Sequence, residues 1–344
     1  MAVPFLPPSK RARDEPTTDR IGMGWEMKRA LVLGTVAALF FASTFVLNRA
    51  MTLDGGNVLW LAGLRYLFTV PLLGAVVLMR REGALIWREL RLRPGPWLLW
   101  GTIGFGLFYL PLTWVARWAP AWLVAGSWQL TIVLGSLLVP FIEPDPQKRR
   151  IPVADLWPSA VILAGVALTE WLSHGHLGPH LWEALLLVMI AAIAYPLGNR
   201  QMMRYTRHRS ADFSVYQRTL GMTLGSMPFW IVTMGIGWVQ QGLPSIHVTL
   251  GALAIALFSG VVATLLFFAA TDLAQGRASW LARIEATQSL EIVFTVLLAS
   301  LLFGQRWPTA EQGLGLLIIM AGMILHSRPR PQPQPENNEA TWSG

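Results

Sequence analysis

The sequence predicts an all-α polytopic membrane protein with ten transmembrane helices, arranged as two inverted five-helix repeats. Of its 344 residues, 53% are hydrophobic and 13% are charged, and the mean hydropathy is +0.47. Soluble domains carry roughly 25% charged residues. Apolar runs of about 20 residues recur along the chain, the length that crosses a hydrocarbon layer of about 30 Å. Short sequence matches also relate the first half of the chain to the second.

Charged and helix-breaking residues separate the apolar runs. The predicted spans are residues 30–50, 58–79, 97–117, 120–142, 153–172, 181–203, 212–238, 248–272, 278–303 and 308–326. The third and fourth are joined tightly at Ala119-Pro120, which leaves nine spans or a re-entrant segment as an alternative. The polar, Pro-containing ends at 1–29 and 327–344 are expected to be disordered cytoplasmic tails. The two repeats are expected at 30–172 and 173–326.

Basic residues predict the orientation of the spans. Of the 27 Lys and Arg residues, 21 fall in the tails and in the loops on one side of the predicted membrane. The opposite side has only Arg49, Arg117 and Arg306. By the positive-inside rule, both termini are cytoplasmic in a bacterial-type plasma membrane. The net charge of +8 is therefore interpreted as a topology signal, and no nucleic-acid partner is expected.

Matches at a nearly constant offset indicate an internal duplication. Asn48-Arg49 at the end of the first span recurs as Asn199-Arg200 in the sixth, and Arg65 is echoed by Arg218. The fourth and ninth spans match as Ala121-Trp122-Leu123 with Ser279-Trp280-Leu281, and Ser127-Trp128-Gln129 with Ala286-Thr287-Gln288. A duplicated unit of five spans must be inverted in the membrane, and inverted repeats are common in secondary transporters.

Tryptophan and glycine give two further expectations. Many of the 17 tryptophans lie near predicted span ends, where an interfacial belt is expected. These are Trp60, Trp97, Trp118, Trp157, Trp171, Trp182, Trp238, Trp280 and Trp307. Gly221 and Gly225 are spaced for close helix approach, which we expect inside one bundle rather than in a dimer.

Missing motifs argue against an enzyme. The chain has no cysteine, no phosphate-binding loop, no zinc-protease motif and no nucleophile elbow. His174, His176 and His180 cluster in a loop beside glycine and proline, and we interpret them as ordinary loop residues. No metal and no cofactor are expected.

The ninth span carries most of the ionisable residues that fall inside the membrane. Such residues are costly in lipid and usually line a cavity or pair with one another. On a continuous helix, Thr287, Gln288, Glu291 and Thr295 form one polar face. We expect Glu291 to bind a proton or a cationic substrate. The alternative is a permanent ion pair with Arg65 or Arg218. Glu285 is expected to pair with Arg283, two residues away.

The fourth and sixth spans supply the remaining candidates. Trp128 offers an aromatic wall for a cation, and Gln129 lies beside it without any charge nearby. Asn199 and Tyr195 flank Pro196, and a proline inside a span frees a carbonyl that can bind a ligand or simply kinks the helix.

Three stretches resemble the drug/metabolite transporter superfamily, specifically its ten-span EamA-like group and the multidrug resistance efflux branch. They are Ala194–Met203, Gln217–Met222 and Glu285–Glu291, and the resemblance covers roughly residues 30–326. It implies two inverted five-helix repeats, a central cavity lined by the fourth and ninth spans, and export driven by an ion gradient or by exchange. The chain departs from the usual EamA signature, because Ile292 rather than proline follows Glu291. It also lacks the first-helix glutamate of the four-helix exporters.

The leading hypothesis is a secondary transporter that exports small metabolites or drugs, either coupled to protons or facilitative. A flippase for a lipid-linked or amphipathic substrate is the alternative, because five arginines between Arg80 and Arg93 offer charges for anionic headgroups. A membrane enzyme or receptor is a weaker third hypothesis. Expected partners are the small-molecule substrate, membrane lipids and a coupling proton, in a monomer or homodimer.

Overall fold

The computed structural model describes residues 17–142, 153–173, 178–207, 213–274 and 277–328. Every regular element in these ranges is a helix. Seven helical segments are long and apolar enough to cross a membrane: Trp25–Leu53, Val58–Met79, Pro94–Val115, Leu181–Arg207, Val215–Gln241, Ile246–Asp272 and Ser279–Phe303. Shorter apolar helices cover Ala121–Leu137, Leu156–Leu172 and Ala310–His326. The chain is therefore an all-helical, polytopic membrane protein.

The first half of the chain contains more helix than the sequence predicted. Its elements are α1 (Thr17–Leu53), α2 (Val58–Met79), α3 (Gly83–Leu92), α4 (Pro94–Gly101), η1 (Thr102–Gly106), α5 (Leu107–Val115), α6 (Ala121–Trp128), α7 (Leu130–Leu137), α8 (Val139–Ile142) and α9 (Val153–Leu172). Helix α1 begins at Thr17 rather than at residue 30, so residues 17–29 do not form the expected disordered tail. Met27 and Ala30 are buried, and their packing extends the helix. The short helix α3 was not expected.

The second half follows the predicted spans closely. Its elements are η3 (Gly178–His180), α11 (Leu181–Arg207), α12 (Val215–Gln241), α13 (Ile246–Ile255), η4 (Ala256–Ala263), α14 (Thr264–Asp272), α15 (Ala278–Ala286), η5 (Thr287–Ser289), α16 (Leu290–Phe303) and α17 (Ala310–His326). Capping boxes start α12 at Ser214 and α17 at Thr309. These caps satisfy backbone donors that the first helical turn leaves free.

Four apolar segments are interrupted within their length. A π-helical stretch occurs at Thr102–Gly106 and another at Ala256–Ala263. Helix α6 gives way to α7 at Gln129, and a 3₁₀ turn at Thr287–Ser289 separates α15 from α16. Neither of these last two breaks contains a proline. Such irregular turns often occur at functional sites.

Polar side chains that bond to the preceding turn accompany both breaks. Ser127 donates to the carbonyl of Leu123 (2.8 Å), and the Gln129 amide donates to the carbonyl of Ala125 (3.1 Å). In the other break, Ser289 donates to the carbonyl of Ala286 (2.8 Å). Side chains that compete for backbone carbonyls in this way bend helices.

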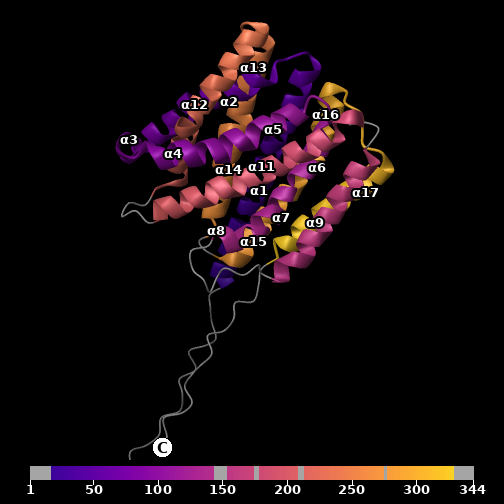
Figure 1. Cartoon of the computed structure of the whole chain (residues 1–344). Helices are drawn as coiled ribbons and strands as arrows, with labels where there is room; N and C mark the ends of the chain where they lie inside the picture. Colours follow the sequence, from indigo (N-terminus) through magenta and orange to yellow (C-terminus); the bar gives the residue numbers. More distant parts are fainter. Residues whose placement is uncertain (1–16, 143–152, 174–177, 208–212, 275–276, 329–344) are drawn as a thin grey trace, which may run out of the picture.

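The helices form one bundle in which segments distant in sequence lie side by side (Figure 1). Helix α12 packs along α2 and α4, α11 packs along α5 and α7, and α9 pairs with α17. Helix α1 contacts α14 and α16. We call the end with the α1–α2 turn the Asp54 end, and the end with the α2–α3 turn the Arg80 end.

Close helix approach depends on small residues, as expected in lipid. The backbone of Gly225 contacts that of Trp97, and a methyl group on Gly221 would collide with the Trp97 indole. Both glycines therefore serve packing within this bundle. Trp97 is completely buried, so its assignment to the interfacial belt was wrong. The exposed tryptophans at helix ends agree with the belt: Trp157, Trp171, Trp182, Trp238 and Trp307.

Candidate functional site

Glu291 lies in the first turn of α16, directly after the 3₁₀ turn. Its side chain is half-buried. In the part of the chain that the structure describes, the carboxylate accepts no hydrogen bond and forms no ion pair. Its oxygens are not among the polar atoms that are fully buried without a hydrogen-bond partner. A free carboxylate inside a membrane-spanning segment marks a functional candidate.

Aromatic side chains from three other helices surround this region. Tyr195 of α11 interacts electrostatically with Glu291. Its ring lies 5.4 Å from that of Trp128 in α6 and 4.9 Å from that of Phe108 in α5. Trp128 and Phe108 contact each other at 4.8 Å. Tyr195 nevertheless keeps 38% of its surface exposed, and Trp128 is partly exposed. Tyr195 therefore connects this aromatic group to the region of Glu291.

A second aromatic group continues from the first towards the Asp54 end. Tyr66 interacts electrostatically with Tyr195, stacks on Trp230 at 4.6 Å and meets Tyr109 edge-on at 5.6 Å. The Tyr109 hydroxyl donates to the Asn48 side-chain oxygen at 2.9 Å. These contacts join α1, α2, α5, α11 and α12 around one aromatic cluster.

Arg65 adds a cation to this cluster. Its guanidinium carbon lies 3.8 Å from the centre of the Tyr109 ring and 5.4 Å from that of Tyr66. One guanidinium nitrogen, Nη1, is buried without a hydrogen-bond partner. Tyrosine faces stabilise a cation electrostatically. The site therefore contains an arginine held by aromatic rings and a glutamate without a partner.

The expected ion pairs are not present among the described residues. Arg65 and Arg218 form no salt bridge with Glu291, and Arg283 forms none with Glu285. Arg283 and Glu285 are both exposed on α15, and residues two apart on a helix point in different directions. In this conformation Arg283, Glu285 and Glu291 form no ion pairs with the expected partners. The pairing of these charges stays a prediction.

The polar face predicted for the ninth segment divides between two environments. The Gln288 amide donates to the backbone carbonyl of Gly34 in α1 and to the Thr287 hydroxyl, both at 3.1 Å. Thr287 donates to its own helix at Ile284 (2.6 Å). Thr287 and Gln288 thus bind the 3₁₀ turn to α1, while Glu291, one turn further along, is left free.

The other candidates also separate. Gln129 is only 3% exposed and bonds within its own helix, so only Trp128 of that pair borders the site. The Asn199 amide donates to the carbonyl of Tyr195 (2.8 Å). Helix α11 continues through Pro196, so Asn199 lies one turn after Tyr195 on the same helix.

Several residues of this region were missed by the sequence reasoning. Tyr66, Tyr109 and Phe108 resemble ordinary packing aromatics in the sequence. Glu170 near the end of α9 is buried, and one of its carboxyl oxygens lies within hydrogen-bond distance of the Ser127 hydroxyl. Glu170 could have been identified from the sequence, because a carboxylate within an apolar run is a candidate for a functional residue.

Metal binding has little support in the described ranges, where no group of three or more His, Asp or Glu residues gathers. His180 stacks on Trp118 with 4.3 Å between the ring centres. His174 and His176 lie outside the described residues.

A helical membrane bundle with a free carboxylate and an aromatic site inside it is the architecture of a membrane transporter. The chain belongs to the EmrE family, described as "Putative multidrug resistance efflux transporter", whose model matches residues 28–331. This family is part of the drug/metabolite transporter superfamily, and the chain is accordingly a membrane transporter.

Two relatives and a solved structure are similar to this chain. "Uncharacterized protein YjlA" of Bacillus subtilis (strain 168) is 44% identical over 315 residues, which cover 88% of this chain and 96% of that protein. A 42.1 kDa protein of Shouchella clausii, described by its position in the intracellular alkaline protease 3'region, is 42% identical over 76% of this chain and 70% of its own length. A solved structure described as "Crystal structure of protein" covers 86% of this chain and 95% of its own, with a TM-score of 0.57 and 17% identity. That likeness shows the fold alone.

Proposed function

We propose that the protein is a secondary transporter that exports a small metabolite or drug-like molecule, driven by a proton gradient or by exchange. The observation that carries this proposal is the unpaired, half-buried Glu291 next to the aromatic cluster. An intramembrane carboxylate without a fixed partner is available to a proton or to a cationic substrate. A glutamate locked in an ion pair would serve structure only.

In the proposed mechanism, proton and substrate bind at the same place. Glu291 takes either a proton or the positive group of the substrate, and the free faces of Trp128 and Tyr195 contact the apolar part. Asn199, Gln288 and Thr287 belong to the polar surroundings that we expected from the sequence. Competition for one carboxylate couples export of the substrate to entry of the proton.

Arg65 gives this mechanism a second charge to use. A buried guanidinium retains its charge under physiological conditions, and its free Nη1 lacks an acceptor in this conformation. We propose that Arg65, Arg218 and Arg283 pair with carboxylates in other states of the cycle. Such exchange of partners would bias the bundle between two arrangements.

The proposed architecture is ten spans in two inverted five-helix repeats, residues 30–172 and 173–326, with both termini cytoplasmic. The recurrent interruptions support it: the π-helical stretches begin 154 residues apart, at Thr102 and Ala256. The breaks at Gln129 and Thr287 are 158 residues apart, close to the offsets of the sequence matches. The Arg80 end carries the basic loops and is the proposed cytoplasmic end. A monomer or a homodimer fits this architecture.

The test uses the purified full-length protein in liposomes with a pH indicator trapped inside. A panel of amines, amino acids and nucleotides is added with and without a pH gradient, and substrate-driven proton movement is recorded. We expect a responding class for the wild type and no proton movement for Glu291→Gln, at the level of protein-free liposomes.

Glu311→Gln is the matched control, because Glu311 is an exposed glutamate in the first turn of α17. It removes the same charge far from the aromatic cluster and should respond like the wild type. Substrate uptake without proton movement in both wild type and Glu291→Gln would indicate a facilitator or exchanger. Unchanged proton coupling in Glu291→Gln would refute the role of this residue.

Helix α3 keeps the flippase alternative open. It exposes Trp87 and Leu92 beside Arg88 and Arg91, while Ile86 is completely buried. An apolar surface next to arginines suits the headgroup region of anionic lipids. Replacing Arg88 and Arg91 by glutamine should leave a small-molecule exporter active and should abolish lipid translocation by a flippase, measured with a fluorescent lipid and a membrane-impermeant quencher.

A further inference from the structure

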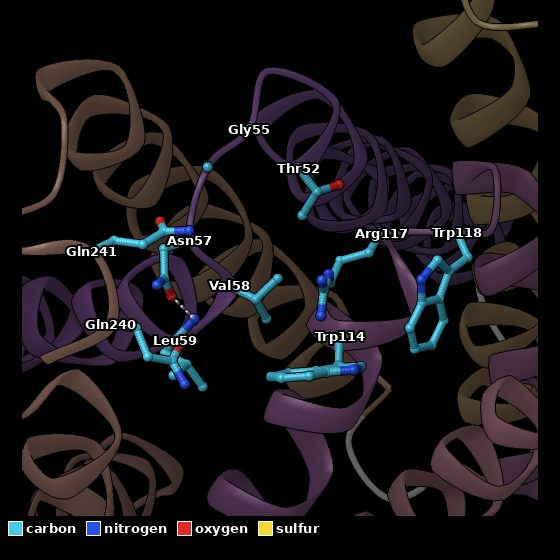
Figure 2. Close-up of a pocket in the computed structure, with 11 residues that line it drawn as sticks. Thr52, Gly55, Asn57, Val58, Leu59, Trp114, Arg117, Trp118, Gln240 and Gln241 are labelled. Atoms are coloured by element: carbon cyan, nitrogen blue, oxygen red, sulfur yellow. Dashed lines mark hydrogen bonds between the residues drawn. The ribbon is translucent and has the colours of Figure 1, made fainter. Parts of the chain in front are cut away.

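A separate cavity of about 300 Å³ opens at the Asp54 end of the bundle. It lies between the α1–α2 turn, the end of α5 and the end of α12 (Figure 2). The residues that matter below are Asn57, Trp114, Arg117, Trp118, Gln240 and Gln241. Arg65 lies seven residues further along α2 than Val58 at the cavity, or about 10 Å at a rise of 1.5 Å per residue. We call this cavity the vestibule, and it is distinct from the Glu291 site.

The charge in the vestibule is positive. Arg117 contributes the lining charge, and no aspartate or glutamate belongs to the residues that line the cavity. Within the described ranges, the Arg117 guanidinium forms no hydrogen bond or ion pair, and it lies 4.9 Å from the Trp114 ring centre. Asp54 is adjacent in sequence to the lining residue Gly55, and its carboxylate lies 3.5 Å from His247 Nδ1. The guanidinium has five N–H donors, which are thus available to an acceptor from outside.

Neutral donors add to this charge. Asn57 uses its side-chain oxygen to cap α2, accepting from the backbone N–H of Leu59 at 2.8 Å (Figure 2). Its amide N–H groups remain for a ligand. Gln240 and Gln241 add two exposed amides at the end of α12. The 22-residue helix α2 begins at this cavity, and the N-terminus of a helix favours negative charge.

The wall that holds Arg117 is fixed in place. Arg49 of α1 donates to the backbone carbonyls of Ala116 (2.9 Å) and Arg117 (2.8 Å). The Thr52 hydroxyl also donates to the carbonyl of Ala116 at 2.8 Å. Trp118 is stacked on His180 with an interplanar angle of 3°. These contacts fix the backbone that carries Arg117 and the Trp118 ring before any ligand arrives, which lowers the entropic cost of binding.

We propose that the vestibule binds a small organic anion that carries an aromatic or branched apolar group. The anionic group would lie against Arg117 and the amides, and the apolar group against the parts of the Trp114 and Trp118 indoles that Arg117 and His180 leave uncovered. A carboxylate matches the fork of a guanidinium geometrically, and the indoles give apolar area that a bare inorganic ion would not use. By the orientation proposed above, this vestibule faces the outside of the cell. It would take up an anion from outside, separately from the positive group that Glu291 binds.

The test measures equilibrium binding by ¹⁹F NMR, with the full-length protein in nanodiscs of phosphatidylcholine. The probes are 5-fluoroindole-3-acetate and its neutral counterpart 5-fluoroindole-3-acetamide. We expect the acetate to bind at least tenfold more tightly than the amide. Arg117→Gln should weaken acetate binding at least tenfold and leave amide binding unchanged.

Arg306→Gln is the matched control, because Arg306 is an exposed arginine that does not line the vestibule. It should bind the acetate like the wild type. The double variant Gln240→Ala/Gln241→Ala gives an independent check that keeps every charge, and it should weaken acetate binding about threefold or more. Thermal unfolding of each variant verifies that it is folded.

Three outcomes would overturn the proposal. The first is equal weakening by Arg117→Gln and Arg306→Gln, which would indicate general attraction to a basic surface. The second is no acetate binding at millimolar concentration. The third is complete displacement of the acetate when phosphatidylglycerol replaces phosphatidylcholine, which would assign the site to a lipid headgroup. Binding is measured without a gradient, so failure here leaves the transport role of Glu291 standing, and the reverse also holds.

Discussion

The breaks in the fourth and ninth apolar segments have similar sequences but different surroundings. In the fourth apolar segment, the break at Gln129 is buried. The Gln129 amide bonds back to its own helix, and the Ser127 hydroxyl contacts both its own helix and Glu170 of α9. In the ninth segment, the break at Thr287–Ser289 is bound to another helix, because the Gln288 amide reaches the Gly34 carbonyl in α1. Both breaks thus contact a neighbouring helix, but Ser127 and Gln129 are buried, whereas Thr287 and Gln288 are half-buried.

The charge follows the same division. Gln129 aligns with Gln288 at an offset of 159, which places Ile132 opposite Glu291. Only the ninth segment therefore has an acid at this position. The fourth segment thus has an aromatic residue, Trp128, at its break, while the ninth has an unpaired carboxylate, Glu291, directly after its break.

A carboxylate placed in the buried break should have the largest effect on the protein. Gln129→Glu puts an acid where the side chain is 3% exposed and where no described cation lies ready to pair. An uncompensated buried charge costs roughly 3–5 kcal/mol. We expect Gln129→Glu to lower the melting temperature strongly. Thermal unfolding in detergent, monitored by tryptophan fluorescence, measures this loss.

Glu291→Gln is the control for that experiment, since it removes a charge at the matched break. Its melting temperature should stay close to that of the wild type, because the wild-type carboxylate has no partner to lose. If Gln129→Glu were as stable as Glu291→Gln, the two breaks would not differ in environment as described.

The interface between α1 and the ninth segment should tolerate no added atoms. A methyl group on Gly34 would lie 2.6 Å from the Thr287 hydroxyl and 3.6 Å from the carbonyl of Ile284. Overpacking of this kind costs about 1–3 kcal/mol, so Gly34→Ala should lower stability and impair transport. Gly74→Ala, whose methyl group would meet nothing within 4 Å, should leave both unchanged. Equal behaviour of the two variants in thermal unfolding would contradict the close contact at Gly34.

The aromatic wall of the fourth segment should contribute to binding rather than to coupling. Trp128→Ala removes the ring that contacts Phe108 and Tyr195, and aromatic pairs contribute about 0.5–1.5 kcal/mol. The dissociation constant of the transported substrate should therefore rise by about two- to tenfold, while its proton stoichiometry stays the same. Trp182→Ala, at an exposed helix end, serves as the control in a radioligand binding assay. A changed stoichiometry in Trp128→Ala would assign this residue to coupling instead.

Much of the bundle was predictable from the sequence because lipid restricts the choices. Backbone groups in hydrocarbon must be satisfied within a helix, so long apolar runs identified the long spans reliably. The tight turn at Ala119–Pro120 is also present, between α5 and α6. Helix α3 was missed because its apolar and basic residues alternate over only ten positions, too few to be distinguished from a loop.

The candidate site was predictable only in part, for a geometric reason. A projection at 100° per residue assumes an unbroken helix, yet the 3₁₀ turn at Thr287–Ser289 changes the phase of the residues before it relative to those after it. Gln288 therefore contacts α1 although it shares the predicted face with Glu291. Tyr66 and Tyr109 come from other spans, and nothing local in the sequence shows that their rings hold Arg65.

The smallest predicted effect concerns the bond between the ninth segment and α1. Gln288→Ala removes the Gly34 contact, and a neutral hydrogen bond contributes about 0.5–1.5 kcal/mol. Hydrogen exchange should become faster in peptides from both α15–α16 and α1, because the bond joins two helices. Gln129→Ala removes a bond of similar length within one helix, so faster exchange should be confined to α6–α7. If Gln129→Ala loosened α1 as much as Gln288→Ala, the fourth segment would be coupled to α1 as well, and the division of roles between the two breaks would fail.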